Sequence, residues 1–319
     1  MEASQQQRMD EPARQDAPSE HIKLALKPKM IFFVALTHLG GLVGLVLLCL
    51  NERWWRLLLE VIVYWQIAGL GITAGAHRLW SHRSYKASSP LRFILMLMNC
   101  AAHQGSIYHW CRDHRIHHKF SETDADPHNS QRGMFFAHMG WLLRDKHPQV
   151  LKKGGELDLS DLEADWVVTF QAKHYKKLST LFCYILPGLY GQYVYGDYWL
   201  GLFAHGLLHH VVLLHSTWSV NSLAHLYGMR PYDDAIRPVE NFFVSLCAVG
   251  EGWHNWHHCY PFDYAASEYG ILGRYNPTKL FIDACHRIGL VTGRKRAIHL
   301  WESKKARLAA ASAKRHWPS

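Results

Sequence analysis

The hydrophobic positions of the chain gather in four long runs that are separated by polar segments. The first run covers residues 30–50 and has no charged side chain, whereas the second, 57–76, is interrupted only by Glu60. The third and fourth runs, 179–196 and 198–218, are separated by a short turn. A helix of about 20 apolar residues crosses a hydrocarbon core of about 30 Å. The pattern therefore predicts four membrane-spanning helices, arranged as two helical hairpins.

The rest of the chain is polar enough to form a large part outside the membrane, since the mean hydropathy is only −0.16. Residues 1–29 are rich in Gln, Asp and Glu, and we expect them to be disordered. Residues 30–293 form the main domain, and residues 294–319 form a basic tail. The expected fold is an all-α membrane protein in which four transmembrane helices carry a helical cytosolic cap.

The basic residues indicate the orientation of the four helices. An even number of crossings places the N-terminus, residues 78–178 and everything after residue 219 on one side of the membrane. Of 35 Lys and Arg, only Arg53 and Arg56 fall in the two loops on the opposite side. Because Lys and Arg concentrate in cytosolic segments, we expect both termini and the cap to be cytosolic.

The net charge of +9 does not indicate a nucleic-acid-binding protein, since no zinc-finger or RNA-binding pattern accompanies the basic residues. Anionic membrane lipid or an acidic protein is the expected partner. Eight Lys or Arg lie between residues 294 and 315. Two interpretations of this tail stay open, a solvated disordered segment and a segment that adheres to anionic lipid.

Histidines form the most informative pattern in the chain. The segment DHRIHH at 113–118 places three histidines at positions i, i+3 and i+4, and HNWHH at 254–258 repeats that spacing. Residues with this spacing share one face of a helix. Each segment can therefore direct three imidazoles toward a metal ion. The residues are His114, His117 and His118 in the first segment, and His254, His257 and His258 in the second.

Two further groups lie where predicted membrane helices end. HRLWSH places His77 and His82 five positions apart, which is about 140° around a straight helix. These two side chains converge only if the helix ends between them, or else they belong to different metal sites. NSLAH places Asn221 and His225 one turn apart after the fourth predicted span. All four groups face the cytosol, and nine histidines suffice for two metal ions.

The type of metal follows from the type of ligand. A single segment of this kind is more typical of a hydrated surface helix, but repetition at membrane exits on one side favours metal binding. Imidazole suits zinc, copper, iron or nickel. Seven cysteines without a Cys-x-x-Cys pair give neither a disulfide framework nor the thiolate pattern of structural zinc. Two redox-active irons and dioxygen chemistry on a lipid chain are therefore favoured. The candidate carboxylates for orienting the imidazoles are Asp113, Asp124, Asp126 and Glu251.

Four other histidines lie inside the fourth apolar run, and they can be compared with the candidate metal ligands. Intramembrane histidines often have a function, but we expect structural roles here because the other groups lie at the membrane surface. A His-rich metal transporter would place its ligands near the middle of the bilayer. Only these four histidines would support that alternative: His205, His209, His210 and His215.

Four segments resemble the signature segments of the membrane-bound acyl-CoA desaturases, the stearoyl-CoA (delta-9) desaturase family of animals. They are GITAGAHRLWSHRSYKA, RDHRIHHKFSETDADPHNS, NSLAHLYGMRPYD and VGEGWHNWHHCYPFDY. The likeness extends from about residue 60 to residue 290, with the histidine groups in the family's order. It implies an enzyme that inserts a cis double bond, most often delta-9, into a saturated fatty acyl-CoA with O2 and two electrons.

The resemblance also implies cofactors, partners and location. It implies two iron ions (Fe2+), with Asn221 bound through a water. It implies electrons from cytochrome b5 and its NADH-dependent reductase, and a multi-pass protein of the endoplasmic reticulum membrane in contact with membrane lipid. Carried over by matching motif, the metal ligands are His77, His82, His114, His117, His118, His225, His254, His257 and His258.

Substrate contacts carry over less completely. Arg112 and Asp113 match family positions that contact the CoA part, and the basic stretch 144–153 is a further candidate for phosphate contact. Trp218 matches an aromatic at the bend of the acyl tunnel, although an interfacial tryptophan also serves as a membrane anchor. Where the family usually has Gln-Asn-Asp, this chain has Gln104, Gly105 and Ser106, and His109 stands where the family usually has Glu. These departures remove polar contacts near the head-group site.

The second predicted span holds the expected end of the acyl tunnel. Trp65 and Gly69 match family positions that close the tunnel, and they share one helix face. They precede His77 by 12 and 8 residues, which at about 1.5 Å per residue is roughly 18 and 12 Å. Ordinary helix packing is the alternative for both residues.

A sister di-iron membrane enzyme is the main alternative function. A lipid hydroxylase or an acyl-lipid desaturase would use the same histidine spacing, so the spacing does not separate these reactions. Preferred chain length and oligomeric state are likewise not encoded in these motifs.

Overall fold

The computed structural model describes residues 22–270 and 273–315. Segment 1–21, most of the region predicted to be disordered, lies outside the described residues. The described chain is mostly helical, with one two-stranded antiparallel sheet formed by β1 (Lys86–Ala87) and β2 (Val291–Thr292). The prediction of an all-α architecture is therefore confirmed apart from this short ladder.

The first helical pair agrees with the first two apolar runs. Helix α2 spans Pro28–Leu50, and α3 (Trp54–Leu70) continues without a break into the π-helical segment η1 (Gly71–Ser81). Among the described residues, Pro28–Leu50 and Trp54–Ser81 are the two helices that are long and apolar enough to cross a membrane. Large apolar side chains of α2 remain exposed, including Phe32 and Leu50 at 70% and 77%. Such a surface suits lipid rather than water.

The third and fourth runs also form a helical pair. Helices α8 (Trp166–Thr180), η4 (Leu181–Ile185) and α9 (Leu186–Tyr195) follow one another directly. After a turn at Gly196 and Asp197, α10 (Tyr198–Leu200), η5 (Gly201–Leu208) and α11 (His209–Leu226) do the same. Tyrosines and Gln192 in the third run, and four histidines in the fourth, make both less apolar than the first pair. Membrane crossing by these helices therefore stays a prediction.

Glycines allow the helices of the two pairs to approach closely. A Cβ atom at Gly44 on α2 would lie 2.1 Å from the carbonyl oxygen of Phe203 on η5. A Cβ atom at Gly191 would lie 2.4 Å from the Cα atom of Gly201. Both contacts exclude any side chain, as is usual where membrane helices pack through small residues. The first contact holds α2 against the second pair, and the other joins the two helices of the second pair.

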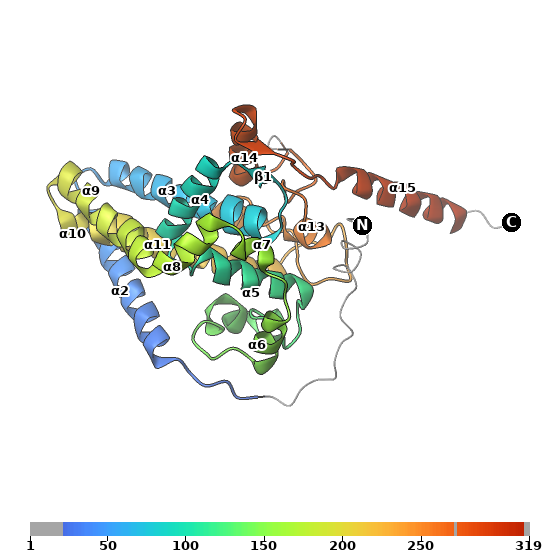
Figure 1. Cartoon of the computed structure of the whole chain (residues 1–319), viewed down its shortest axis with the longest axis horizontal. Helices are drawn as coiled ribbons and strands as arrows, with labels where there is room; N and C mark the ends of the chain where they lie inside the picture. The colour runs from blue at the N-terminus through green and yellow to red at the C-terminus, as the bar shows by residue number, and fades with distance from the viewer. Residues whose placement is uncertain (1–21, 271–272, 316–319) are drawn as a thin grey trace.

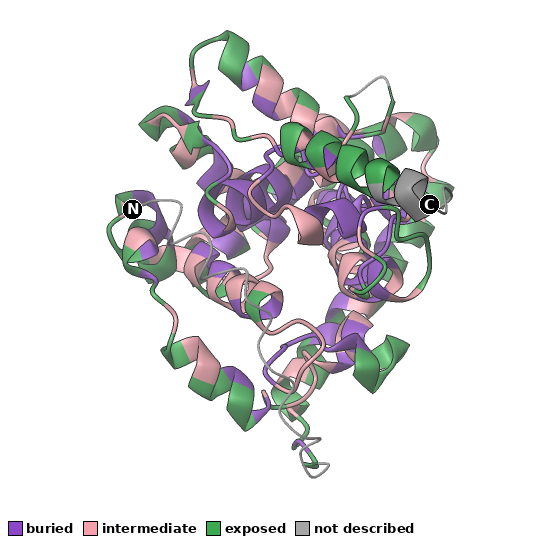
Figure 2. Cartoon of the chain, turned by 90° about the vertical axis from the view of Figure 1, so that its right-hand side faces the viewer, coloured by how far each residue is buried: buried purple, intermediate pink, exposed green. Residues whose placement is uncertain are grey.

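The remaining elements form the cap. Figure 1 shows the α2–α3 turn and the α9–α10 turn at one end of the molecule, and α5, α13 and α14 toward the other end. Buried residues concentrate inside the cap when it is viewed from that end (Figure 2). The cap elements are α4 (Ser89–Ala102), α5 (Ile107–Lys119), η2 (Ser130–Arg132), η3 (Phe136–Gly140), α6 (Pro148–Gly155), α7 (Ser160–Glu163), α12 (Phe242–Cys247), α13 (His254–Cys259) and α14 (Pro277–Arg287).

The basic tail forms a helix over most of its length. Helix α15 spans Ile298–Arg315, and Figure 1 shows it projecting from the cap on the side opposite to α9 and α10. Its first turns are anchored by Trp301, which is only 7% exposed. The described part of the tail is thus ordered at its start.

Candidate metal centre

The end of the second helix brings His77 and His82 together. Segment η1 is π-helical, and the backbone N–H of His82 donates to the carbonyl oxygen of His77 at 3.1 Å. An i to i+5 hydrogen bond adds about one residue to the turn and places the two positions above one another. The helix also ends at Ser81, so the first of the two conditions stated for their convergence is met. Their ring centroids lie 4.9 Å apart.

All nine histidines singled out from the sequence converge, and they do so in two groups. Within each group the candidate ligand atoms lie within 4.8 Å of one another. Helices α5 and α13 contribute to both groups, because His117 and His118, or His257 and His258, are neighbours with diverging directions. The five-histidine group comprises His77, His82, His114, His118 and His257, and the four-histidine group comprises His117, His225, His254 and His258.

The spacing of the ring nitrogens is that of ligands around a common centre. In the five-histidine group, the Nε2 atom of His257 lies 3.0 Å from that of His77 and 3.0 Å from that of His118. In the four-histidine group, the Nε2 atom of His254 lies 3.1 Å from those of His225 and His258. Metal–nitrogen bonds of about 2.1 Å at right angles would separate neighbouring ligands by about 3.0 Å. The arrangement fits two metal ions.

Carboxylates lie against the second nitrogen of three rings. The Nδ1 atom of His117 lies 2.8 Å from Asp126, and the Nδ1 atom of His225 lies 2.8 Å from Glu122. The Nδ1 atom of His77 lies 3.0 Å from Glu251, whose other oxygen accepts from Arg78 at 2.8 Å. Such contacts fix the tautomer and the direction of a metal-binding ring.

Two of the four predicted carboxylates, Asp126 and Glu251, therefore contact the rings, and one contacting residue was missed. Glu122 adopts a left-handed backbone conformation with φ of 62°, which turns its side chain toward His225. Its place inside the signature segment that begins at Arg112, four residues after His118, was the signal in the sequence. Asp113, by contrast, pairs with Lys146 and Arg112 at the cap surface.

Burial keeps most of these imidazoles neutral, as metal binding requires. Loss of hydration lowers the pKa far below its ordinary value, and repulsion between neighbouring rings adds to this effect. The residues are His82, His114, His118, His254, His257 and His258. Burial also opposes protonation of His117, but Asp126 and Glu122 outweigh it and raise the pKa of that ring.

An apolar cavity of about 50 Å³ reaches both histidine groups. Its lining includes Gly69, which was predicted to lie on it, and Asn221, which lies one turn before His225 on α11. Trp65 is not in the lining, and it packs beside the cavity against the cluster that contains Leu213. The remaining lining residues are Ile72, Thr73, His77, Trp110, His114, His117, Leu213, Ser216, Thr217, Val220, Ala248, Val249, Glu251 and His254.

Trp218 lies outside this lining as well. Its indole stacks on His38 with centroids 6.2 Å apart, and it also contacts His138 and His215. It is only 3% exposed, so it does not act as an interfacial anchor in contact with water.

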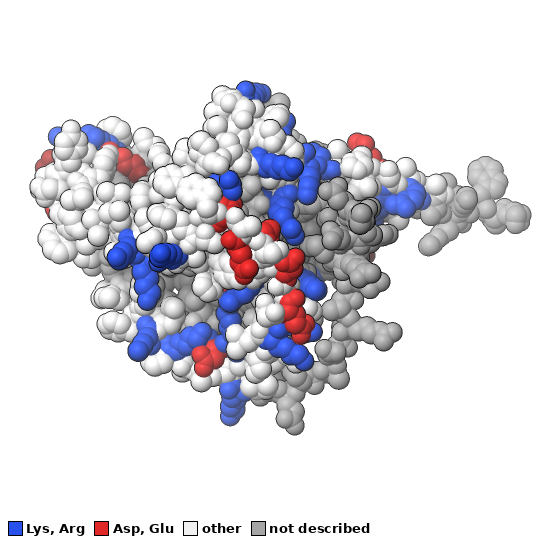
Figure 3. Space-filling model, viewed as in Figure 1, with Lys and Arg blue, Asp and Glu red and all other residues white. Residues whose placement is uncertain are grey.

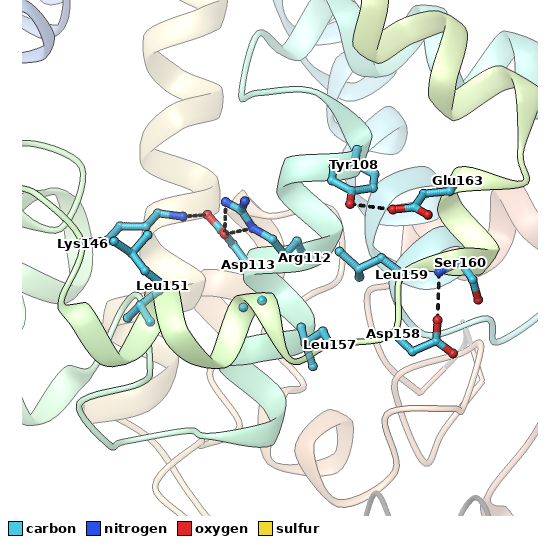
Figure 4. Close-up of a pocket in the computed structure, with 13 residues that line it drawn as sticks. Tyr108, Arg112, Asp113, Lys146, Leu151, Leu157, Asp158, Leu159, Ser160 and Glu163 are labelled. Carbon is cyan, nitrogen blue, oxygen red and sulfur yellow. Dashed lines mark hydrogen bonds and ion pairs between the residues drawn. The ribbon is translucent and has the colours of Figure 1, made fainter.

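A second, larger cavity of about 530 Å³ opens on the cap surface between α5 and α6. Arg112, Asp113 and Lys146 form an ion-paired row along its wall, and Tyr108 donates to Glu163 at 3.1 Å (Figure 4). Burial opposes ionisation of Asp113, but Lys146 and Arg112 outweigh it and hold the pKa of that carboxyl below its ordinary value. The cavity thus combines two cations with a polar rim.

Gly105, Ser106 and His109, the positions that depart from the family pattern, form local hydrogen bonds at the start of α5. Ser106 caps α5 and accepts from the backbone N–H of His109, and its hydroxyl lies 2.8 Å from the Nδ1 atom of His109. Gly105 has φ of 97°, a conformation that favours glycine, and its N–H donates to Tyr175 at 2.8 Å. Ser106 therefore caps the start of α5, and Gly105 suits the backbone conformation before it.

The four histidines of the fourth apolar run have protein partners instead of a shared centre. His205 lies 3.1 Å from Glu60, and His209 lies 3.2 Å from the carbonyl oxygen of Ala101. In the described part of the chain, groups of candidate ligands form only at the nine histidines and at His117 with Asp126 and His128. The contacts of the other two rings are His210 with Tyr184, and His215 with His38 and His138.

The sequence was compared with models of protein families and with curated proteins. No model of a protein family matches the chain. A stearoyl-CoA desaturase of Capra hircus is 50% identical over 300 residues, covering 94% of this chain and 81% of that protein. The stearoyl-CoA desaturase of Homo sapiens is 49% identical over 289 residues, covering 90% and 79%. The delta(9)-fatty-acid desaturase fat-6 of Caenorhabditis elegans is 46% identical over 276 residues, covering 86% and 80%.

Proposed function

Because the chain belongs to the stearoyl-CoA desaturase family, we propose that it is a fatty acyl-CoA desaturase, an oxidoreductase that inserts a cis double bond at the delta-9 position. One observation carries the proposal. Apolar residues such as Leu213 and Val220 line the same cavity as His77 and His254, so a methylene group in that cavity would lie against both histidine groups.

Two iron ions fit the two groups. Both groups offer only imidazole nitrogens, which suit iron, copper, nickel or zinc, and zinc has no redox chemistry. One iron would be held by the five-histidine group and the other by the four-histidine group, with Asn221 contributing through a water. Bound iron would supply oxidation of an unactivated methylene by O2 and two electrons.

The protein's own contribution is orientation and exclusion of water. Glu122, Asp126 and Glu251 hold imidazoles in one direction, so the ligand geometry is set before substrate arrives. The surroundings of the cavity are closed by buried apolar side chains, including Leu213 and Ala248. Position selectivity follows from how far the acyl chain enters, because only a methylene held beside the metals reacts.

The head of the substrate has a matching site on the cap. The cavity lined by Arg112 and Lys146 offers two cations to the phosphates of CoA, and Asp113 offers an acceptor to the amide groups of its pantetheine arm. Support comes from its place on α5, the helix that also carries His114. The acyl chain would pass from this cavity toward the histidines.

The far end of the acyl tunnel lies on the second helix. A Cβ atom at Gly69 would approach the Cγ2 atom of Val249 to 2.8 Å, so a larger residue would displace Val249 and crowd the cavity that both residues line. Trp65 packs one turn deeper and would stop the methyl end. Trp218 lies on α11, the helix that carries Asn221, and would stabilise the bend of the acyl tunnel from there.

The chain is a membrane protein, and we propose four crossings in the endoplasmic reticulum membrane with both termini cytosolic. Exposed apolar side chains on α2 suit contact with membrane lipid. The two short turns, near residues 51–53 and 196–197, lie at the same end of the molecule (Figure 1). Only Arg53 and Arg56 among the 35 Lys and Arg lie at that end, as expected for the lumenal side.

Cytochrome b5, reduced by its NADH-dependent reductase, is the electron donor that we propose from the family resemblance. The reaction consumes two electrons from outside, and the basic cap suits an acidic carrier protein.

Expression in a desaturase-deficient yeast tests the proposed function. We expect growth without added unsaturated fatty acid, and a cis double bond at carbon 9 in the total fatty acids. Hydroxylated products would instead identify a lipid hydroxylase. Double bonds that form only in intact lipids, with purified acyl-CoA inert, would identify an acyl-lipid desaturase.

A further inference from the structure

An aromatic cluster connects helix α13 with helix α15. Trp256 lies between His254 and His257 in the sequence of α13 and is fully buried. Its ring centroid is 4.9 Å from that of Tyr232 and 6.5 Å from that of Trp301 on α15. The backbone of one candidate ligand helix is therefore in packed aromatic contact with a helix at the surface of the cap.

The outer end of the cluster lies directly beneath basic side chains. Trp301 is 7% exposed, and the Nζ atoms of Lys304 and Lys305 lie 5.9 and 5.5 Å from its ring centroid. Tyr232 closes the cluster from the side, 5.0 Å from Trp301. Trp301 is thus the last buried ring before the solvent on this side of the molecule.

The surface above Trp301 carries more basic than acidic side chains, although Arg294, Arg296 and Lys305 form ion pairs. Between residues 294 and 310 the chain has six Lys or Arg and one acidic residue, Glu302. Figure 3 shows Lys and Arg gathered where α14 and α15 meet. Lys305 forms an exposed ion pair with Glu268, and Arg307 is exposed. We call Lys304, Lys305 and Arg307, with Trp301 beneath them, the α15 face.

The direction of α15 decides which partner can reach this face. The helix projects from the end of the molecule opposite the α9–α10 turn (Figure 1), and it is exposed along most of its length (Figure 2). A membrane around the apolar helices would therefore lie far from its outer turns. This arrangement favours a soluble or tethered acidic protein over anionic lipid as the occupant of the α15 face.

We propose that the α15 face is the docking surface for an acidic one-electron carrier, and that the packed rings of Trp301, Tyr232 and Trp256 form the route by which its electrons reach the histidine groups. The inference rests on the proposed function, since a desaturase needs electrons from outside. Charge complementarity would draw the carrier to the face, and the aromatic contact would shorten the gap between its redox group and the metals.

The electron balance requires two encounters for each product. Each encounter oxidises the carrier by one electron, which tunnels through the packed rings without oxidising them. Two such electrons, two protons, one O2 and the two hydrogens removed from adjacent methylenes give two waters and one carbon–carbon double bond. The established family reaction supplies the oxidant, and the carrier supplies the reductant.

A binding measurement tests the docking surface without depending on the metals. Full-length protein in nanodiscs, freed of metal, is titrated with the oxidised haem domain of cytochrome b5. We expect the Lys305→Glu/Arg307→Glu variant to associate roughly tenfold more slowly at low salt, and the difference should shrink in high salt. Lys173→Glu, an exposed reversal on α8, is the matched control and should bind as the wild type does. Equal association of the double variant and the wild type would overturn the proposal.

The aromatic route has its own test in the metal-loaded protein. Oxidation of the reduced haem domain is followed by stopped flow at saturating carrier, so that the limiting rate reports transfer within the complex. We expect Trp301→Leu to slow this rate severalfold with binding unchanged, and Trp301→Phe to restore much of it. If binding and rate fall together in Trp301→Leu, the ring only anchors α15 and the route is refuted.

Chemical reduction separates failure of this inference from failure of the proposed function. Dithionite-reduced wild type, supplied with stearoyl-CoA and O2, should form the unsaturated product, and the α15-face variant should form as much. Product formation in both, with equal carrier binding, would remove the docking surface alone. Absence of product in the wild type would instead remove the proposed reaction.

Discussion

The imidazole rings of His77 and His82 lie 4.9 Å apart although five positions separate them in the sequence. The π-helical turn between them explains this proximity, because the hydrogen bond from the N–H of His82 to the carbonyl of His77 closes a wider turn. Both rings consequently belong to the five-histidine group. Within that group, His77 also contacts His114 and His257. A straight α-helix would have directed them to different places.

Each histidine group should respond separately to loss of one member. His82→Ala removes a ligand from the five-histidine group, and His258→Ala removes one from the four-histidine group. We expect the altered group to bind its metal more weakly, whereas the other group keeps all its imidazoles and retains its ion. Both variants should lose activity. Mass spectrometry of the bound metal, with circular dichroism as a folding control, measures this. Full occupancy with normal activity in either variant would refute the division into groups.

Removal of an orienting carboxylate should weaken metal binding without removing a ligand. Asp126→Asn keeps the shape of the side chain but loses the charge beside the Nδ1 atom of His117. We expect the affinity of the four-histidine group for metal to fall roughly 10–100-fold, measured by competition with a chelator. Glu156→Gln, an exposed change on the cap, is the matched control. Unchanged retention of metal in Asp126→Asn would show that the contact does not orient the ligand.

The tunnel assignment predicts opposite shifts in chain-length preference. Gly69→Leu displaces Val249, crowds the cavity that both residues line, and should shift preference toward shorter acyl-CoAs. Trp65→Ala should admit longer ones. The double bond, counted from the carboxyl end, should stay at the same carbon in both, because the head-group site is unaltered. Gas chromatography of products from acyl-CoA mixtures measures this. Wild-type chain-length profiles in both active variants would exclude these residues from the tunnel.

Stability should depend on pH through Glu240. Burial raises the pKa of this carboxyl from 4.5 to about 7, although its ion pair with Arg274 at 2.7 Å works in the opposite direction. Between pH 4.5 and about 7, the folded protein therefore keeps a proton on Glu240 that the unfolded chain has released. Its stabilising contribution is complete below pH 4.5 and is lost as the pH rises through 7.

Replacing this carboxyl should flatten the dependence. Glu240→Gln should reduce the loss of stability between acidic and mildly alkaline pH by up to about 3 kcal/mol, and it keeps an oxygen that accepts from the backbone N–H of Trp256. Thermal unfolding in detergent at both pH values measures the difference, with the exposed Glu302→Gln as control. The same pH dependence in wild type and Glu240→Gln would contradict the assignment.

Periodicity along the chain was sufficient to find the nine histidines that cluster, but not their division into two groups. The i, i+3, i+4 pattern places three rings on one helix face, yet His117 and His118 belong to different groups. Their assignment depends on how α5 packs against α11 and α13, which local spacing does not encode. The position of Glu122 depends likewise on a left-handed turn whose direction only the folded chain reveals.

For the apolar helices, too, the sequence predicts local features but not those that depend on packing. The boundaries of the first two apolar runs agree with α2 and with the helix Trp54–Ser81, because uninterrupted apolar composition is a local property. The π-helical turn at the end of the second helix arises from packing and hydrogen bonding around His77, so sequence spacing left two arrangements open. Order at the start of the basic tail depends on Trp301 packing against Trp256, a contact between distant segments.

Product analysis with the iron-loaded protein tests the central claim most directly. Protein isolated from its native membrane is analysed for iron, reduced with dithionite, and supplied with stearoyl-CoA and O2 in a single turnover. We expect about two irons per chain and a product with a cis double bond at carbon 9. Stoichiometric zinc in a protein that is nevertheless active, or iron-loaded protein that leaves stearoyl-CoA saturated, would contradict the account.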